Sequence, residues 1–239
     1  PVDSEKIEFN QKNSNQLFIL NGGGLTLNDL VAKTNQEIAK SVIAFAQFDD
    51  SVYLLQNNGF VLIVKNHDII NATRLNAIPL IIEKEIYYNL TLTKTKIFLE
   101  KGTALLLFDE EKKTFIDIAE NITNFQISPD NQKIAYSDGK KINIYYLEEK
   151  REQPPKKPGD KIALIELSDN INQLLWLNND YLIISTENAL IFLETDERGQ
   201  PNTTILAQFK NPKFFFDKNT KKTSVLTEGN FFVYPKILP

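Results

Sequence analysis

The sequence contains no cysteine and no methionine, and His67 is its single histidine. Without cysteine the chain has no disulfide framework and no thiolate metal site. A single histidine excludes a histidine-based metal cluster, and nothing around His67 suggests a Ser–His–Asp triad. We therefore expect no metal, no cofactor and no catalytic residue. His67 lies in the polar stretch 65–68, which is typical of a solvent-exposed turn.

Long apolar runs and concentrated positive charge are also missing. No segment approaches the roughly 18 apolar residues that span a bilayer, so we expect no membrane contact by this domain itself. The net charge is −4 with a pI near 5.3, and no predicted face gathers Lys and Arg, which argues against nucleic-acid binding. The chain starts at Pro1 rather than Met. We expect an excised domain or a processed fragment of a larger parent, so that any signal peptide or membrane anchor of the parent lies outside this sequence.

The chain contains a short sequence pattern that recurs six times. Each copy is a β-rich run that ends in a tight turn with Gly or Asn. The copies start 35, 45, 37, 48 and 43 residues apart, which is the period of a propeller blade. The runs and turns are Gln16–Leu20 with Asn21–Gly24, Ser51–Leu55 with Asn57–Gly59, Lys96–Leu99 with Lys101–Gly102, Lys133–Tyr136 with Asp138–Gly139, Tyr181–Ile184 with Glu187–Asn188, and Ser224–Leu226 with Glu228–Asn230. The repeat predicts an all-β fold, a β-propeller of four-stranded antiparallel blades. Six blades are favoured, and seven remain open.

The blades follow one another within a single predicted domain, 1–239. Their approximate ranges are 5–41, 42–86, 87–121, 122–169, 170–210 and 211–239. The segment Leu27–Lys40 is predicted as strand plus loop rather than helix. The last unit shows only three strands, and an open edge is prone to aggregation. We therefore predict that Val2–Phe9 packs beside the last unit, unless closing strands lie in parent sequence.

Several segments resemble a known propeller family. Ile127–Gly139 resembles the "strand, S-P-D-G, strand" signature of TolB-like and WD40-like β-propellers, with Asn131 where Gly is usual. Ile171–Gly199, which includes Trp176, is similar to the propeller of PEGA-domain proteins from candidate-phylum bacteria. The resemblance covers residues 87–235. It implies a surface-exposed, extracytoplasmic propeller in a membrane-anchored parent, with a largely unassigned function.

Other motifs are better explained by structure than by chemistry. Carboxylates cluster at Asp49–Asp50, Asp109–Glu111, Glu148–Glu149 and Asp196–Glu197, at equivalent strand ends where turn formation and solvation explain them. Asn21–Gly24 lacks the G-K-[ST] of a phosphate-binding loop and predicts a hairpin. Trp176 and the triplet Phe214–Phe216 are predicted to pack between blades rather than to line a ligand pocket.

We therefore expect a monomeric, non-catalytic binding or scaffold module. Its partner is expected to be a protein or a glycan, contacted through the loops around 65–73, 148–160 and 195–202. The expected location is extracytoplasmic or on the cell surface, with a cytoplasmic location left open. One alternative is a propeller glycoside hydrolase or lyase that uses two converging loop carboxylates. Another is an accessory propeller that gates a peptidase.

Overall fold

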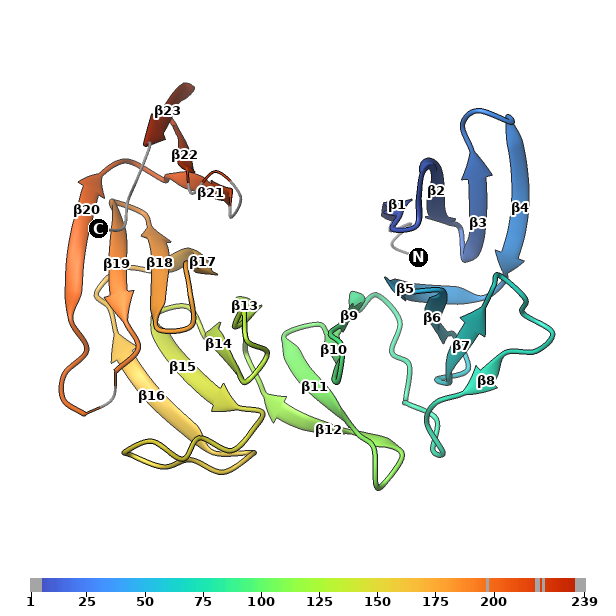
Figure 1. The fold of residues 1–239 in the computed structure, drawn as a ribbon, viewed down its shortest axis with the longest axis horizontal. Helices are drawn as coiled ribbons and strands as arrows, with labels where there is room; N and C mark the ends of the chain where they lie inside the picture. The colour runs from blue at the N-terminus through green and yellow to red at the C-terminus, as the bar shows by residue number, and fades with distance from the viewer. Residues whose placement is uncertain (1–5, 197, 218–219, 221, 235–239) are drawn as a thin grey trace. The chain divides into compact units, whose positions relative to one another are not determined.

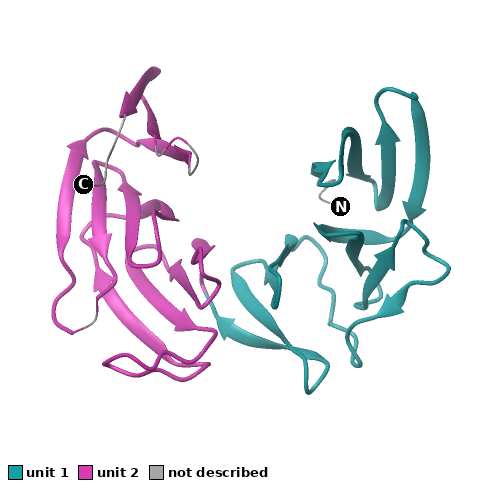
Figure 2. Cartoon of the chain, in the orientation of Figure 1, with its two compact units in different colours: residues 1–120 teal, residues 121–239 magenta. Residues whose placement is uncertain are grey.

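A computed structural model describes residues 6–196, 198–217, 220 and 222–234. All regular structure in these ranges is β, arranged in six antiparallel sheets (Figure 1). The described residues form no helix that is long and apolar enough to cross a membrane. The chain divides into two compact units, residues 1–120 and 121–239, which are described separately (Figure 2).

Unit 1 contains three four-stranded sheets. The first has β1 (Lys6–Asn10), β2 (Asn13–Asn21), β3 (Gly24–Asp29) and β4 (Thr34–Ala39). The second has β5 (Val42–Phe48), β6 (Ser51–Gln56), β7 (Val61–Lys65) and β8 (Thr73–Arg74). The third has β9 (Tyr88–Leu92), β10 (Ile97–Lys101), β11 (Ala104–Asp109) and β12 (Thr114–Ala119). In each sheet the strands lie side by side in chain order.

Unit 2 repeats this plan, with a shorter last sheet. The fourth sheet has β13 (Asn124–Ile127), β14 (Lys133–Ser137), β15 (Lys141–Tyr146) and β16 (Lys161–Glu166). The fifth has β17 (Ile171–Trp176), β18 (Tyr181–Thr186), β19 (Ala189–Glu194) and β20 (Thr203–Gln208). The described residues of the sixth form β21 (Lys213–Asp217), β22 (Lys222–Thr227) and β23 (Asn230–Tyr234).

The turns explain why the chain reverses where it does. Gly22 and Gly23 join β2 to β3 with φ angles of 55° and 79°. A two-residue turn with both φ angles positive matches the twist of the strands it connects, and glycine reaches those angles without strain. Asn131, which replaces the usual Gly of the S-P-D-G turn, has a φ of 59°. Asn is among the few residues that tolerate this region.

The cores lie between adjacent sheets, where the facing side chains of neighbouring sheets pack together. In unit 1, Phe18 and Leu25 of the first sheet belong to one cluster with Phe45 and Leu54 of the second. A further cluster joins the second sheet to the third, and unit 2 has equivalent clusters between its own neighbouring sheets. This stacking of four-stranded antiparallel sheets is propeller architecture.

The predicted fold class is therefore confirmed, with three strands in the last sheet as expected. Leu27–Lys40 contains the end of β3 and all of β4, so the strand-plus-loop prediction is also correct. Of the predicted closing segment, Val2 to Glu5 lie outside the described residues. Lys6–Asn10 pairs with β2 in the first sheet, and closure against the last unit stays a prediction.

Candidate functional site

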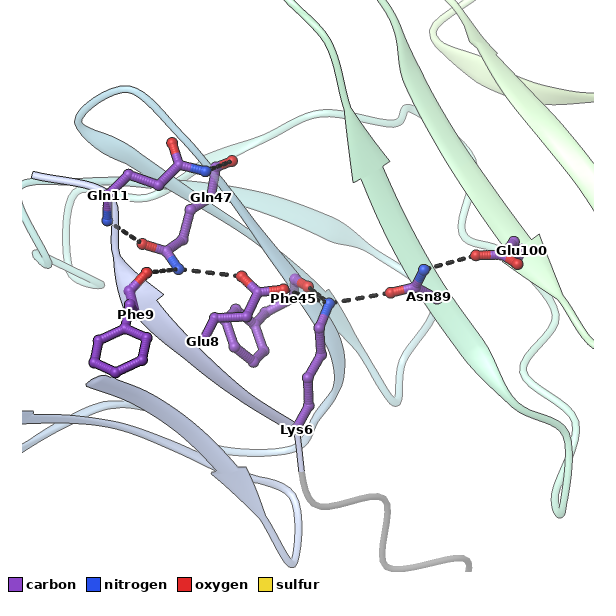
Figure 3. Close-up of polar contacts among 8 residues, drawn as sticks. All are labelled: Lys6, Glu8, Phe9, Gln11, Phe45, Gln47, Asn89 and Glu100. Atoms are coloured by element: carbon purple, nitrogen blue, oxygen red, sulfur yellow. Dashed lines mark hydrogen bonds and ion pairs between the residues drawn. The ribbon is translucent and has the colours of Figure 1, made fainter. Parts of the chain in front are cut away.

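A line of polar side chains crosses the first strands of the three sheets in unit 1 (Figure 3). Lys6 lies at its centre. Its Nζ donates to the carbonyl of Phe45 at 2.8 Å and to Oδ1 of Asn89 at 3.0 Å, and it pairs with Glu8 Oε1 at 2.9 Å. These contacts satisfy the three N–H groups of the ammonium. Lys6 on β1 therefore ties together β5 and β9.

Amide side chains extend this line in both directions. Gln47 donates from Nε2 to Glu8 Oε2 and to the carbonyl of Phe9, both at 3.1 Å, and accepts from the Gln11 backbone at 3.3 Å. At the other end, Asn89 donates to Glu100 Oε2 at 2.6 Å. We call the set Lys6, Glu8, Gln11, Gln47, Asn89 and Glu100 the polar seam. Both of its carboxylates accept hydrogen bonds from a neighbouring strand, so the seam fixes the positions of the strands.

A small pocket adjoins the polar seam at Gln47 and brings together three residues to which the sequence assigned structural roles. Asp49, Asp50 and His67 all line it, with Lys12 between the β1 and β2 strands. Lys12 pairs with both aspartates, and its hydrogen bond to Asp49 raises the pKa of the lysine. The volume is about 70 Å³, far below the roughly 300–1,000 Å³ of pockets that hold drug-sized ligands. The pocket therefore fits water or a small ion rather than a sugar.

His67 differs from its predicted solvent-exposed state. It does lie in a turn, with a φ of 61°, but its ring makes an edge contact with Phe18 at 5.5 Å between centroids and is half-buried. Burial lowers the pKa of the imidazole. The hydrophobic contact could not be foreseen because Phe18 lies 49 residues earlier in the sequence.

The carboxylates of the remaining clusters form hydrogen bonds and ion pairs within turns. Asp109 accepts the backbone N–H groups of Glu111 and Lys112, both at 3.0 Å, and Glu110 pairs with Lys113. Asp196 binds the guanidinium of Arg198, which lowers the pKa of Asp196 to about 2. Glu149 forms an ion pair with Nε of Arg151 at 3.2 Å. Glu197 lies outside the described residues. Within those residues, no three His, Cys, Asp or Glu side chains gather as a metal site.

The aromatic residues mostly pack between sheets, as predicted. Trp176 is 2% exposed, and its Nε1 donates to the carbonyl of Gln126 in the neighbouring sheet at 3.0 Å. Phe214 is fully buried and Phe216 partly buried against the fifth sheet. Phe215, in contrast, is 61% exposed. It points to the opposite face of β21, since successive residues of a strand alternate, so packing was the wrong prediction for this residue.

The fourth strand of the second sheet is largely replaced by residues 75–87, which we call the strap. Asn76 anchors it, with 1% exposure, by donating to the carbonyls of Gly59 at 3.0 Å and Ile78 at 2.7 Å. The backbone N–H of Leu80 also donates to the Gly59 carbonyl. A β-carbon on Gly59 would lie 2.0 Å from the Leu80 oxygen. Only glycine permits so close an approach.

The strap, fixed by these hydrogen bonds, and the turn before it expose isoleucine side chains to solvent. Ile78 and Ile81 on the strap are 66% and 79% exposed, and Ile70 in the preceding turn is 91% exposed. The turn is itself ordered, because Asp68 accepts the N–H of Ile70 at 3.0 Å and binds the Asn71 amide at 2.7 Å. Of the three predicted contact loops, 65–73 thus carries a protruding apolar group. The strap was not predicted from the sequence.

The other two predicted contact loops are polar. Residues 148–160 include an isolated bridge between Lys150 and Lys156. The loop 195–202 holds the Asp196–Arg198 pair.

Comparisons with known proteins bear on the fold. No family model and no curated protein sequence matches the chain. Among solved structures, Hsv2 of Kluyveromyces lactis is similar with a TM-score of 0.65 and 13% identity, over 99% of this chain and 76% of that one. The N-terminal domain of Nup159 gives 0.56 and 9%, over 98% and 75%. The computationally designed Ika8 protein gives 0.60 and 12%, over 95% and 69%.

At these identities the likeness concerns the fold alone. It shows a β-propeller fold, and the resemblance to WD40-like propellers stays a prediction. The more specific resemblance to TolB-like and PEGA-domain propellers stays a prediction, as do the extracytoplasmic location and the single-domain organisation.

Proposed function

We propose that this chain is a protein-binding propeller module, and that the strap and the preceding turn form its contact surface. The observation that carries the proposal is the exposure of Ile70, Ile78 and Ile81 on segments with hydrogen-bonded frames. Burying one such side chain against a partner gains about 1.5–3 kcal/mol. An ordered loop loses little further conformational entropy on binding.

The polar seam supports this role by holding together the first strands of the three sheets in unit 1. Binding residues are commonly found on loops that a rigid scaffold positions. Among the similar structures is a complex that contains the S. cerevisiae proteins Dbp5 and Nup159, so the fold occurs in a protein–protein assembly. Isoleucine offers no hydrogen bond to a sugar hydroxyl, which favours a protein over a glycan as the partner of this surface.

Photo-crosslinking in an extract of the source organism tests the proposal. Three forms of the chain are compared: the natural one, a triple variant with Ile70→Ser, Ile78→Ser and Ile81→Ser, and a control with Leu30→Ser and Val31→Ser. The control residues are also aliphatic and exposed, at 53% and 72%, in the ordered turn after β3. Exposed substitutions of this kind change stability little.

The expected result is a protein captured by the natural chain and by the control, and at least 10-fold less by the triple variant. Equal capture by all three forms, with equal melting temperatures, would contradict the proposal.

A further inference from the structure

Within the part of the chain that the structure describes, no strand pairs with the outer edge of the sixth sheet. Among the described residues, β23 pairs only with β22, whereas every other sheet has a fourth strand beside its third. An open edge presents backbone N–H and C=O groups to any extended chain that reaches it. β23 is therefore a place where a strand can be added.

The register of the β22–β23 hairpin shows which groups face outward. The turn between the strands is Glu228–Gly229, with φ angles of 46° and 77°, and Thr227 pairs with Asn230 next to it. Hydrogen-bonded and non-hydrogen-bonded pairs alternate along an antiparallel ladder. Starting from the bonded pair at the turn, Phe232 bonds inward to Val225. Phe231 and Val233 direct their backbone groups away from β22.

The other sheets show how an outer strand pairs with a third strand in this chain. Four of them have an outer strand of six residues, and each contains a bulge near the start of the third strand. The bulges lie at Leu25/Thr26, Leu105/Leu106, Ile142/Asn143 and Leu190/Ile191. In β3 and β11, which follow two-residue turns as β23 does, the bulge comes one residue after the pair that closes the turn. The equivalent place in β23 is Phe231/Phe232.

The outer strands also share a chemical feature at this bulge. The extra residue that each contributes is Ile38, Ile118, Leu164 or Leu206. All four are branched aliphatic residues, and the first three are buried. The residue that follows is Ala39, Ala119, Ile165 or Ala207, which is again apolar. The chain thus repeats one requirement for a strand in this position.

We propose that the β23 edge accepts an extended segment of another polypeptide as its outer strand. The segment runs antiparallel to β23 over about six residues, and it carries Ile or Leu at the bulge with an apolar residue after it. Backbone hydrogen bonds to Phe231 and Val233 supply affinity, and the aliphatic residue supplies sequence preference. The site lies in unit 2 and uses no residue of the strap, so it is independent of the surface proposed above.

Amide hydrogen exchange on the full chain, followed by NMR, tests this proposal. The probe is a synthetic peptide with the sequence of residues 113–120, which contains the outer strand β12. The matched control peptide carries Ile118→Asp. At saturating probe peptide, the amides of Phe231 and Val233 are expected to exchange at least 10-fold more slowly. The amide of Phe232, already bonded to β22, changes little, and the control peptide protects neither outward amide.

Two variants of the chain sharpen the test. Val233→Pro removes an outward N–H without removing a β22–β23 hydrogen bond, and Val233→Thr keeps the N–H. We expect the probe peptide to slow exchange of the Phe231 amide in the Val233→Thr variant but not in the Val233→Pro variant. If Val233→Pro does not fold, the comparison of the two peptides on the natural chain still decides.

Three results would overturn the proposal. The first is protection of the Phe231 and Val233 amides before any peptide is added, since the edge would then be held by this chain or a second copy. The second is no protection at saturating peptide, and the third is equal protection by the Ile118→Asp peptide.

Discussion

At the scale of single residues, His67 shows how a turn residue is coupled to the core. Its positive φ places the ring against Phe18 instead of in solvent. Burial of the ring disfavours the charged form, which lowers the pKa of the imidazole. Asp49 and Asp50 line the same pocket, but Lys12 pairs with both. Folding therefore disfavours the charged imidazole relative to the unfolded chain.

This preference predicts a pH dependence of stability. The folded pKa lies below the unfolded value of about 6.5, so between the two the unfolded state binds more protons. The free energy of unfolding then falls as the pH drops below about 6.5, by at most about 1.4 kcal/mol per pH unit from this residue. His67→Asn tolerates the positive φ and removes the titration. Urea denaturation at pH 7.5 and 5.5 should show a smaller loss on acidification for the variant. An equal or larger loss would contradict the assignment.

At the scale of elements, Lys6 joins three strands that are far apart in the chain. Replacing it with Met leaves the Glu8 carboxylate and the Asn89 carbonyl oxygen without their partner, in surroundings where the Lys6 side chain is only 28% exposed. Unsatisfied polar groups of this kind cost about 1–3 kcal/mol. We expect Lys6→Met to lower the free energy of unfolding by that amount in urea denaturation.

The control for this prediction is Lys40→Met. Lys40 also pairs with a glutamate, at 3.5 Å, but its side chain is 76% exposed, and surface pairs contribute little. We expect no measurable change for Lys40→Met. Equal effects of the two substitutions would mean that the polar seam does not stabilise unit 1.

Strands were more predictable than the contacts between them. The β-rich run Lys133–Tyr136 and the Asp138–Gly139 turn are local signals, and the structure places β14 and its turn there. The strap and the polar seam depend on partners distant in sequence. Asn76 reaches Gly59 across 17 residues, and Lys6 reaches Asn89 across 83. No local pattern encodes such pairs, so neither the strap nor the seam could be predicted from the sequence.

At the scale of the whole molecule, net charge and the open edge of β23 act together on solubility. The net charge is −4 at pH 7 and reaches zero near pH 5.3, where mutual repulsion between molecules is lost. One face of the last sheet also exposes apolar residues, with Phe215 61%, Phe231 63% and Val233 52% exposed. An exposed edge with apolar neighbours is a template for edge-to-edge association.

We therefore expect the purified chain to aggregate fastest near pH 5.3, measured as turbidity at fixed protein concentration. Val233→Lys places a charge on the open edge, as natural edge strands often do, and should slow aggregation several-fold at that pH. Leu30→Lys makes the same change in net charge on an exposed turn of unit 1, which separates the effect of the edge from that of total charge. If both variants slow aggregation equally, charge alone explains the behaviour and the edge of β23 plays no part in it.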